Sequence, residues 1–273
     1  DDIDWTNITD QLSANWFSNL VDGAVSFEYA IGIYSTPSTE VVTWTSTGTD
    51  TFFTHTGLSL TEGATYYSHI RGLDGSSVPI DTASSDGVTI DITAPSMAAI
   101  NEGGLSEDMD FQQSTESLIL SWFGSDEASG IDHYEYGWGT TAGATDIVAW
   151  SESSANSAET TSLTLEDGST YYGSVRATDI AGNMSTLITG NGITIDTSPP
   201  TGGVAIDGDI EDLDFTSSTT TITASWTGFT DTGSGVGDYR YAIGTEPGGV
   251  QNVYWLSVGT NTAFTRTGLS LVH

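Results

Sequence analysis

The sequence contains no cysteine and no lysine, and its four arginines stand against 37 acidic residues. Without cysteine, disulfide bridges and cysteine-ligated zinc sites are excluded. A net charge of −33 excludes ordinary nucleic-acid binding, because contacts with phosphate need cations, and it disfavours anionic membrane surfaces. The charge instead favours solubility, cation binding or both, and a solvated acidic surface explains much of it.

Long apolar runs and targeting signals are also lacking. No stretch of about 18 apolar residues is present, so no membrane insertion is predicted for this segment. No signal peptide is visible and the chain does not begin with Met, which leads us to expect a mature or partial product. The sequence does contain 37% hydrophobic and 10% aromatic residues and 32 glycines, a composition that suits buried cores joined by many turns.

Two series of tryptophans recur along the chain at nearly constant spacing. The first comprises Trp16, Trp122 and Trp226, 106 and 104 residues apart, and the second comprises Trp44, Trp150 and Trp255, 106 and 105 residues apart. An Asp-x-Asp element precedes each tryptophan of the first series, and a segment such as TGLSL or TSLTL follows each tryptophan of the second. These elements recur at the same spacing as the tryptophans. This phase predicts tandem repeats of about 105 residues.

Two similar linkers, GVTIDITAP and GITIDTSPP, place the repeat boundaries near residues 95 and 200. Repeat 1 then covers residues 1–95 without its first strand, repeat 2 covers 96–200 and is complete, and repeat 3 covers 201–273 without its last strands. We expect a window cut from a longer array, or alternatively a partner chain that supplies the missing strands.

Each repeat has the pattern of β-structure. Segments such as TYYGSVRATD and HYEYGWG alternate with a period of two and are rich in aromatic and β-branched residues, which is typical of half-buried strands. Turn signals recur every eight to twelve residues or so, and no segment has a helical period. The sequence therefore predicts an all-β protein made of tandem antiparallel β-sandwiches.

LTEGATYY and LEDGSTYYGSVRATDIAGN resemble the end of a fibronectin type III (Ig-like) domain. In that family a leucine lies six residues before a tyrosine, as in Leu60/Tyr66 and Leu165/Tyr171. The linkers and GSGVGDYRYAIGT resemble tandem repeats of large bacterial surface and secreted proteins, including adhesins. Repeat 1 departs most, with NLVDGAVSF and LDGSSVP. The resemblance implies a core tryptophan on the second strand, and a tyrosine corner in which the hydroxyl bonds to the turn backbone.

The aromatic residues favour a core more than a ligand site. We expect Trp16, Trp122 and Trp226 between the sheets, and Arg71 and Arg176 over neighbouring aromatic rings. If a carbohydrate platform exists, the second tryptophan series is where we would look. The histidines are scattered, and no G-x-S-x-G or H-x-x-x-H motif is present, so no enzyme activity is predicted.

The acidic loop residues gather at the ends of the predicted sandwiches. If neighbouring repeats stack, carboxylates from both would meet at the linkers, and their repulsion favours a hard cation such as calcium. The alternative is that the loops are solvated and apart, and the carboxylates of the Asp-x-Asp elements can also cap backbone N–H groups in their own turns. The candidate ligands are Asp2, Asp4, Asp91, Asp108, Asp110, Asp126, Asp179, Asn183 and Asp196.

These patterns predict a structural spacer or stalk of a long bacterial protein that is secreted or lies on the cell surface, such as an adhesin or surface filament. Its partners would be the neighbouring repeats of the same chain, with calcium stiffening the joints. Two alternatives remain open: a module that binds a surface glycan or another protein chain, and an accessory region of a secreted multidomain enzyme.

Overall fold

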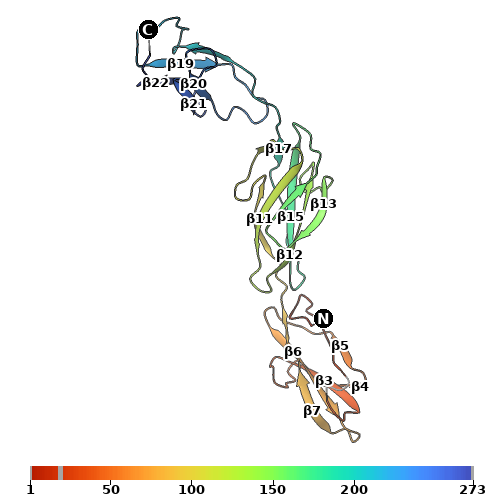
Figure 1. Cartoon of the computed structure of the whole chain (residues 1–273). Coiled ribbons are helices and arrows are strands. Elements are labelled where there is room, and N and C mark those ends of the chain that lie inside the picture. Colours follow the sequence, from red (N-terminus) through yellow and green to blue (C-terminus); the bar gives the residue numbers. More distant parts are fainter. Residues whose placement is uncertain (1, 18–20, 272–273) are drawn as a thin grey trace. The chain divides into compact units, whose positions relative to one another are not determined.

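The computed structural model describes residues 2–17 and 21–271, and all regular elements in that part of the chain are strands (Figure 1). No helix able to cross a bilayer occurs among these residues. Each hydrogen-bonded sheet is built from strands that lie between the boundaries expected for one repeat. The predicted all-β fold is confirmed.

Repeat 2 forms a sandwich of a three-stranded sheet, β14-β11-β9, and a second sheet, β10-β17-β15-β12-β13, with β16 paired to β15. The strands are β9 (Ser96–Glu102), β10 (Phe111–Gln112), β11 (Ser117–Ser125), β12 (Ile131–Gly139), β13 (Val148–Ser153), β14 (Ser157–Thr161), β15 (Thr170–Asp179), β16 (Ile188–Thr189) and β17 (Ile193–Ile195). Trp122 on β11 crosses to the facing sheet, where its ring lies 5.5 Å from that of Tyr134. The alternating apolar residues of both sheets therefore build one core.

Repeat 1 has the same layout, with the sheet β1-β8-β6-β3-β4, β7 paired to β6, and the separate pair β2-β5. Its strands are β1 (Trp5–Thr6), β2 (Gln11–Asn15), β3 (Ser26–Gly32), β4 (Val42–Gly48), β5 (Phe52–Thr56), β6 (Thr65–Leu73), β7 (Pro79–Ser84) and β8 (Val88–Ile90). Trp16, Phe27, Phe53 and Tyr66 lie in its buried core cluster. The core role predicted for Trp16 is confirmed.

Repeat 3 contains two smaller sheets, β18-β19-β22 and β20-β21. Its strands are β18 (Val204–Asp207), β19 (Ile222–Thr227), β20 (Arg240–Ile243), β21 (Val253–Ser257) and β22 (Ala263–Arg266). Its buried core residues are Ile243, Val253 and Leu269, with Tyr241 and Phe264 packed against them. Trp226 on β19 is half-buried here, whereas Trp122 is 3% exposed in repeat 2.

The strand order is that of a fibronectin type III or Ig-like sandwich, as predicted, but two of its strand pairs are parallel. β1 runs parallel to β8, and β10 runs parallel to β17. In each case a two-residue strand pairs with the last strand of the repeat, and in repeat 2 the chain reaches it from β9, which belongs to the other sheet. The period-two pattern of a strand does not reveal this switch, because the pattern fixes faces and not partners.

Two predicted local features are present in repeats 1 and 2. The hydroxyls of Tyr66 and Tyr171 accept hydrogen bonds from the backbone N–H groups of Thr61 and Glu166, each at 3.0 Å, which makes the tyrosine corner. The guanidinium of Arg71 lies 4.3 Å from the ring centroid of Trp44. Arg176 lies in the same way 4.8 Å from the ring of Trp150. The arginines therefore cover ring faces, as their phase predicted.

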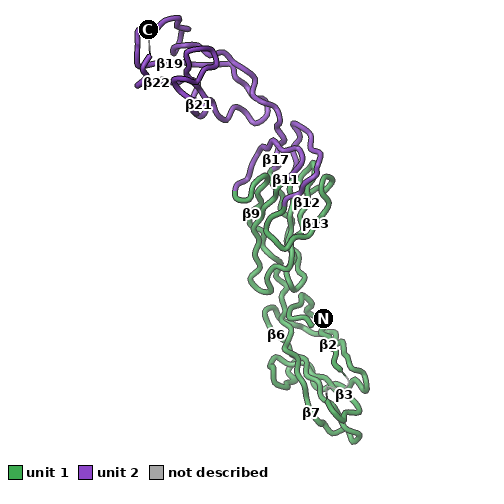
Figure 2. The backbone as a smooth tube through the Cα atoms, in the orientation of Figure 1, with its two compact units in different colours: residues 1–106, 119–158, 172–191 green, residues 107–118, 159–171, 192–273 purple. Residues whose placement is uncertain are grey.

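By its internal contacts the chain divides into two compact units (Figure 2). Unit 1 comprises residues 1–106, 119–158 and 172–191, and unit 2 comprises residues 107–118, 159–171 and 192–273. The division runs through repeat 2, so each unit contains one complete linker with the loops around it. The boundaries near residues 95 and 200 stay a prediction based on the repeat.

Candidate metal centre

Three aspartates meet in unit 1 where three strands end. Asp91 follows β8, Asp126 follows β11, and Asp179 is the last residue of β15. One carboxylate oxygen from each lies within 4.8 Å of the others. Asp91 belongs to the first linker, whereas Asp126 and Asp179 belong to repeat 2. The cluster therefore brings the linker together with the loops of the following repeat, and the role of these three candidates as ligands stays a prediction.

Two members of this cluster are buried, a property that among the described acids they share with Glu102. Asp91 is 0% exposed and Asp179 is 2% exposed, while Asp126 is half-buried. The ion pairs of the described residues lie elsewhere, at Arg71, His133, Arg176 and Arg240. Two unit charges 4 Å apart repel by about 1 kcal/mol in water and about 4 kcal/mol near a protein surface. Three carboxylates without a basic partner are thus a candidate site for a cation, and calcium binding stays a prediction.

Backbone N–H groups hold the carboxylates in place. Asp91 accepts hydrogen bonds from Thr93 and Ser129, both at 3.0 Å. Asp126 accepts two within its own turn, from Ala128 at 3.1 Å and Gly130 at 2.9 Å. A carboxylate oxygen has two lone-pair directions, so an amide contact does not prevent the same group from binding an ion. Capping of backbone N–H groups and binding of an ion are therefore compatible roles for these carboxylates.

Asn183 closes the cluster on the side of the β15 loop. Its backbone N–H donates to Asp179 at 2.7 Å, and its side-chain Nδ2 donates to the second oxygen of Asp179 at 2.8 Å. The same Nδ2 lies 2.8 Å from the backbone oxygen of Asp91. Gly182 provides the left-handed backbone of this turn, with a φ of 94°. Asn183 thus orients Asp179 and ties it to the linker.

The second linker, in unit 2, has counterparts of Asp91 and Asp126. Asp196 accepts hydrogen bonds from Ser198 at 3.1 Å and Ser234 at 2.6 Å, as Asp91 does from its own two partners. Asp231 accepts from Gly233 at 2.9 Å and Gly235 at 3.0 Å, as Asp126 does in its turn. No carboxylate in the described part of repeat 3 takes the place of Asp179. This linker therefore serves as a natural comparison with two carboxylates.

The other candidate ligands lie outside the three-aspartate cluster. Asp2, Asp4, Asp108 and Asp110 are exposed. The backbone oxygens of Asp4 and Asp110 accept hydrogen bonds from Thr89 and Thr194, which places the Asp-x-Asp elements beside the last strands of their repeats. Strand direction in the predicted sandwich grouped them with the linker acids, and their role as ligands stays a prediction.

Sequence reasoning missed how closely the turn before β6 and β15 holds each linker. Glu62 accepts hydrogen bonds from the N–H of Ile92 at 2.6 Å and the hydroxyl of Thr93 at 3.2 Å. Asp167 in repeat 2 likewise accepts from the N–H and the hydroxyl of Thr197, at 2.7 and 2.9 Å. The sequence contained one signal for this role, since both acids stand one residue before the glycine of the turn. These acids fix the linker to its own repeat.

The hydrogen bonds of Asp167 and Asp196 at the second linker are expected to depend on pH. Hydrogen bonds from Thr197 lower the pKa of Asp167, and hydrogen bonds from Ser234 lower the pKa of Asp196. A lowered pKa means that the contact stabilises the fold above the unfolded value, about 3.9, and that this stabilisation disappears as the pH falls through the folded value. We expect the amide proton shifts of Thr197 and Ser234 to be constant from neutral pH to about pH 5 and to change below about pH 4.

An NMR titration of the full chain measures this effect. The variant Asp167→Asn should remove the response of Thr197 and leave that of Ser234, since the two amides bind different carboxylates. A transition above the ordinary aspartate pKa at either amide would contradict the prediction.

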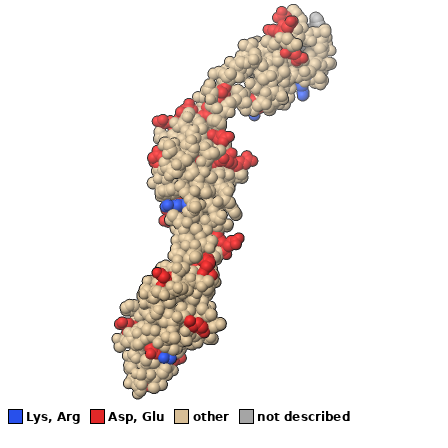
Figure 3. All heavy atoms as spheres, turned by 180° about the vertical axis from the view of Figure 1, so that it is seen from behind, with Lys and Arg blue, Asp and Glu red and all other residues tan. Residues whose placement is uncertain are grey.

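Acidic side chains are also spread over the face shown in Figure 3, where basic side chains are few. Abundance of charge therefore does not single out a site on this surface. The predicted carbohydrate platform is covered in two repeats, because Arg71 and Arg176 lie over Trp44 and Trp150. The third tryptophan of that series, Trp255, is 52% exposed.

No family model matches this chain. Over 238 residues it is 29% identical to Exoglucanase B from Cellulomonas fimi, a match that covers 82% of this chain and 19% of that protein. The chain thus spans about a fifth of the length of this relative. An alignment with the crystal structure of the chicken CNTN1 FN1-FN3 domains covers 96% of this chain and 85% of that one, with 13% identity and a TM-score of 0.35.

Proposed function

We propose that this chain is a spacer segment of a long bacterial protein that is secreted or displayed on the cell surface, such as an adhesin or surface filament. Its tandem sandwiches provide length, and calcium at Asp91, Asp126 and Asp179 fixes the first linker. The observation that carries the proposal is the burial of carboxylates from a linker and from the next repeat in one cluster.

The geometry of the cluster suits calcium. Calcium binds oxygen ligands at about 2.3–2.6 Å, so two ligands on opposite sides of the ion lie roughly 5 Å apart. The aspartate oxygens lie within 4.8 Å of one another. Magnesium needs shorter bonds of about 2.0–2.1 Å and a near-ideal octahedron, so a site assembled from separate loops favours calcium, which tolerates irregular geometry. Water would complete the six to eight ligands or so that calcium takes.

An ion at this place would act mechanically. Asp91 belongs to the linker, and Asp126 and Asp179 belong to repeat 2, so one ion would bind both sides of the joint. It would favour the joined arrangement by its difference in affinity for the joined and open states. The second linker, with Asp196 and Asp231, would respond less because it has two carboxylates.

The proposal is tested by calcium titration and by NMR relaxation of the full chain. We expect one calcium ion to bind at the first linker, and the tumbling of repeats 1 and 2 to become more tightly coupled in CaCl₂ than in EDTA. The variant Asp179→Asn should weaken both effects, while Asp231→Asn, at the second linker, should leave them unchanged. Calcium binding without a change in tumbling would reject the stiffening role, and no binding would reject the calcium site.

A second candidate function is an accessory region of a secreted multidomain enzyme, which the similarity to Exoglucanase B favours. In that role the segment would separate a catalytic domain from other modules, or bind a polysaccharide through an exposed ring such as Trp255. Sedimentation with insoluble cellulose tests the binding form. Sedimentation of the protein with cellulose that Trp255→Ala abolishes would support binding. Recovery of all protein in the supernatant would favour the spacer role.

A further inference from the structure

His69 is a fully buried histidine on β6 of repeat 1. In the sheet it stands between Ala30 of β3 and Ser84 of β7. Its Nδ1 lies 2.8 Å from the hydroxyl of Ser84, and its Nε2 lies 3.5 Å from the hydroxyl of Ser38. Because a hydroxyl can donate or accept, both contacts suit a neutral imidazole in either tautomer. The surroundings of His69 thus satisfy its uncharged form.

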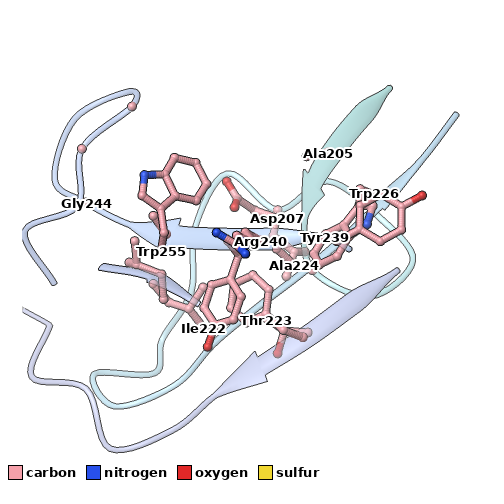
Figure 4. Close-up of a pocket in the computed structure, with 18 of the residues that line it drawn as sticks. Ala205, Asp207, Ile222, Thr223, Ala224, Trp226, Tyr239, Arg240, Gly244 and Trp255 are labelled. Atoms are coloured by element: carbon pink, nitrogen blue, oxygen red, sulfur yellow. The ribbon is translucent and has the colours of Figure 1, made fainter. Parts of the chain in front are cut away.

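The loop between β3 and β4 covers this histidine. Ser38 belongs to this loop, and the backbone of Tyr34 in the same loop hydrogen-bonds to the imidazole. The loop reaches the sheet at Gly32, where an added Cβ would overlap the Oγ and Cβ of Ser38. The corresponding glycines of the other repeats lie against their own loops in the same way, Gly139 against Ala144 and Gly244, labelled in Figure 4, against Gly249. Closure of this loop onto the sheet is therefore common to the three repeats.

The residue beneath the loop differs between repeats 1 and 2. In repeat 2 the position of His69 holds Ser174, which pairs with Gly137 of β12 as His69 pairs with Ala30. Ser174 is also fully buried, and its hydroxyl lies 3.2 Å from that of Thr189. A histidine changes its charge between neutral and mildly acidic pH, whereas a serine does not. Repeat 1 thus has a titratable group where repeat 2 has a neutral one.

Burial has the largest influence on the charge of this imidazole, and it lowers the pKa of His69. The carboxylate of Glu40 and the hydrogen bond with the backbone of Tyr34 act in the opposite direction. Hydrogen bonds from its own backbone and from Ser38 hold the pKa of Glu40 below its usual range. The charged form of His69 is therefore disfavoured as long as the loop is closed, although an acid is close to it.

The other titratable groups on the elements around His69 are Tyr34 on the loop, Tyr67 and Arg71 on β6, Glu28 on β3 and Asp81 on β7. Arg71 and Glu28 form an ion pair with each other. Asp81 lies on the opposite face of the sheet, because β7 pairs Thr82 with Arg71 and Ser84 with His69. Glu40 is thus the carboxylate that acts on His69.

The loop can leave the sheet with little loss of buried surface. Residues 33–40 are exposed except for Ser38, which is half-buried. Strand β6, in contrast, carries Tyr66 and Ile70 of the core cluster. Segments with few buried contacts open more easily than the elements that form the core. Opening of the loop would therefore relieve a charge on His69 while the sandwich stays folded.

We propose that residues 33–40 form a pH-dependent latch, which covers β6 while His69 is neutral and opens when His69 takes up a proton. In the open state water reaches the imidazolium, so the charged ring is no longer buried. The corresponding loop of repeat 2 stays closed under the same conditions, because Ser174 takes up no proton. The latch would change the surface of repeat 1 between neutral and mildly acidic surroundings.

The direction of the pH dependence follows from the lowered pKa of His69. The closed latch binds the proton less tightly than the open one, so opening becomes easier as the pH falls. Above the ordinary histidine value of about 6.5, the ratio of open to closed states should be nearly constant. Below it the ratio should rise, approaching roughly tenfold for each pH unit, until the pH reaches the value of the closed state.

Nitrogen-15 relaxation dispersion on the full chain tests the proposal, because it measures the population of a minor open state. Between about pH 6.5 and about pH 5.5 we expect the open population of residues 33–40 to rise roughly three- to fivefold. Residues 140–147 of repeat 2 are the internal control. Hydrogen bonds from Thr140 lower the pKa of Asp146 in that loop, so its response should begin only below about pH 4.

Two variants separate the roles of the groups. His69→Gln keeps hydrogen-bonding groups but takes up no proton, so the open population should no longer depend on pH. Glu40→Gln removes the carboxylate that favours the charged ring, so the pKa of His69, followed through its imidazole signals, should fall further. Glu40 is exposed, and this variant is therefore expected to fold and to test the latch even if His69→Gln does not fold.

Several outcomes would overturn the proposal: a His69 that titrates at or above about pH 6.5, equal responses of the two loops, or a response that persists in His69→Gln. Unfolding of all of repeat 1 over the same range would also overturn it, since the latch requires a folded core. The response should be equal in EDTA and in CaCl₂, because the candidate calcium ligands lie outside the loop. A response seen in only one of the two would assign it to the aspartate cluster instead.

Discussion

The variant Leu120→Ala is expected to lower the free energy of unfolding of repeat 2 by about 2–5 kcal/mol. Leu120 is 0% exposed and lies between the two sheets, where it contacts the backbone of β15 at Gly173. Truncation removes buried apolar surface and leaves a cavity that a sandwich with strands on both sides closes only in part. Urea unfolding followed through NMR signals of repeat 2 measures the loss for this repeat alone.

The variant Gly173→Ala provides the matched test of the same contact. In the native background the added methyl group meets Leu120, and we expect a loss of about 1–3 kcal/mol from overpacking. In the Leu120→Ala background the space is free, so the same change should cost much less, with a coupling of about 0.5–3 kcal/mol. Additive effects of the two changes would show that this contact does not control the packing of the sheets.

The second large effect concerns calcium. If the ion binds at the cluster, a calcium concentration one hundred times the dissociation constant should stabilise the folded state by about 2.7 kcal/mol. The variant Asp126→Asn should lose most of this gain. In EDTA the same variant should equal or exceed the native chain in stability, because it removes one of three repelling charges and keeps an oxygen for Ala128 and Gly130.

Thermal unfolding in CaCl₂ and in EDTA measures both parts of this prediction. The matched control is Asp231→Asn, since Asp231 makes the same two turn hydrogen bonds at a linker where the described residues bring in no third carboxylate. Its response to calcium should equal that of the native chain. A loss of stability for Asp126→Asn in EDTA as large as that in CaCl₂ would assign Asp126 a purely structural role.

Much of the fold could be predicted from residues that recur in phase. Tyr66 and Tyr171 form the same corner, and Arg71 and Arg176 cover corresponding rings, because equal positions in equal sandwiches have equal surroundings. The same reasoning placed Asp91, Asp126 and Asp179 at one end of the strands that lead to them. Strand direction alone therefore brought these side chains to one linker.

The other features of the fold depend on the path of the backbone, which neither the repeat nor the period-two pattern of the strands predicts. The sequence did not show that Asp108 and Asp110 lie on the exposed approach to β10, which pairs in parallel with β17. The fully buried Glu102, whose Oε1 accepts a hydrogen bond from the N–H of Gly173 at 2.5 Å, had no signal in the sequence. A lone acid in a strand gives no indication that it faces inward.

The contact between Asn183 and Asp91 has a consequence for the order in which the chain assembles. These residues are 92 positions apart, and the amide that holds the linker comes from the far end of β15. During synthesis this contact can therefore form only after Asn183 has emerged, whereas Glu62 can hold Ile92 and Thr93 of the same linker much earlier. The first linker is thus fixed to the repeat before it sooner than to the repeat after it.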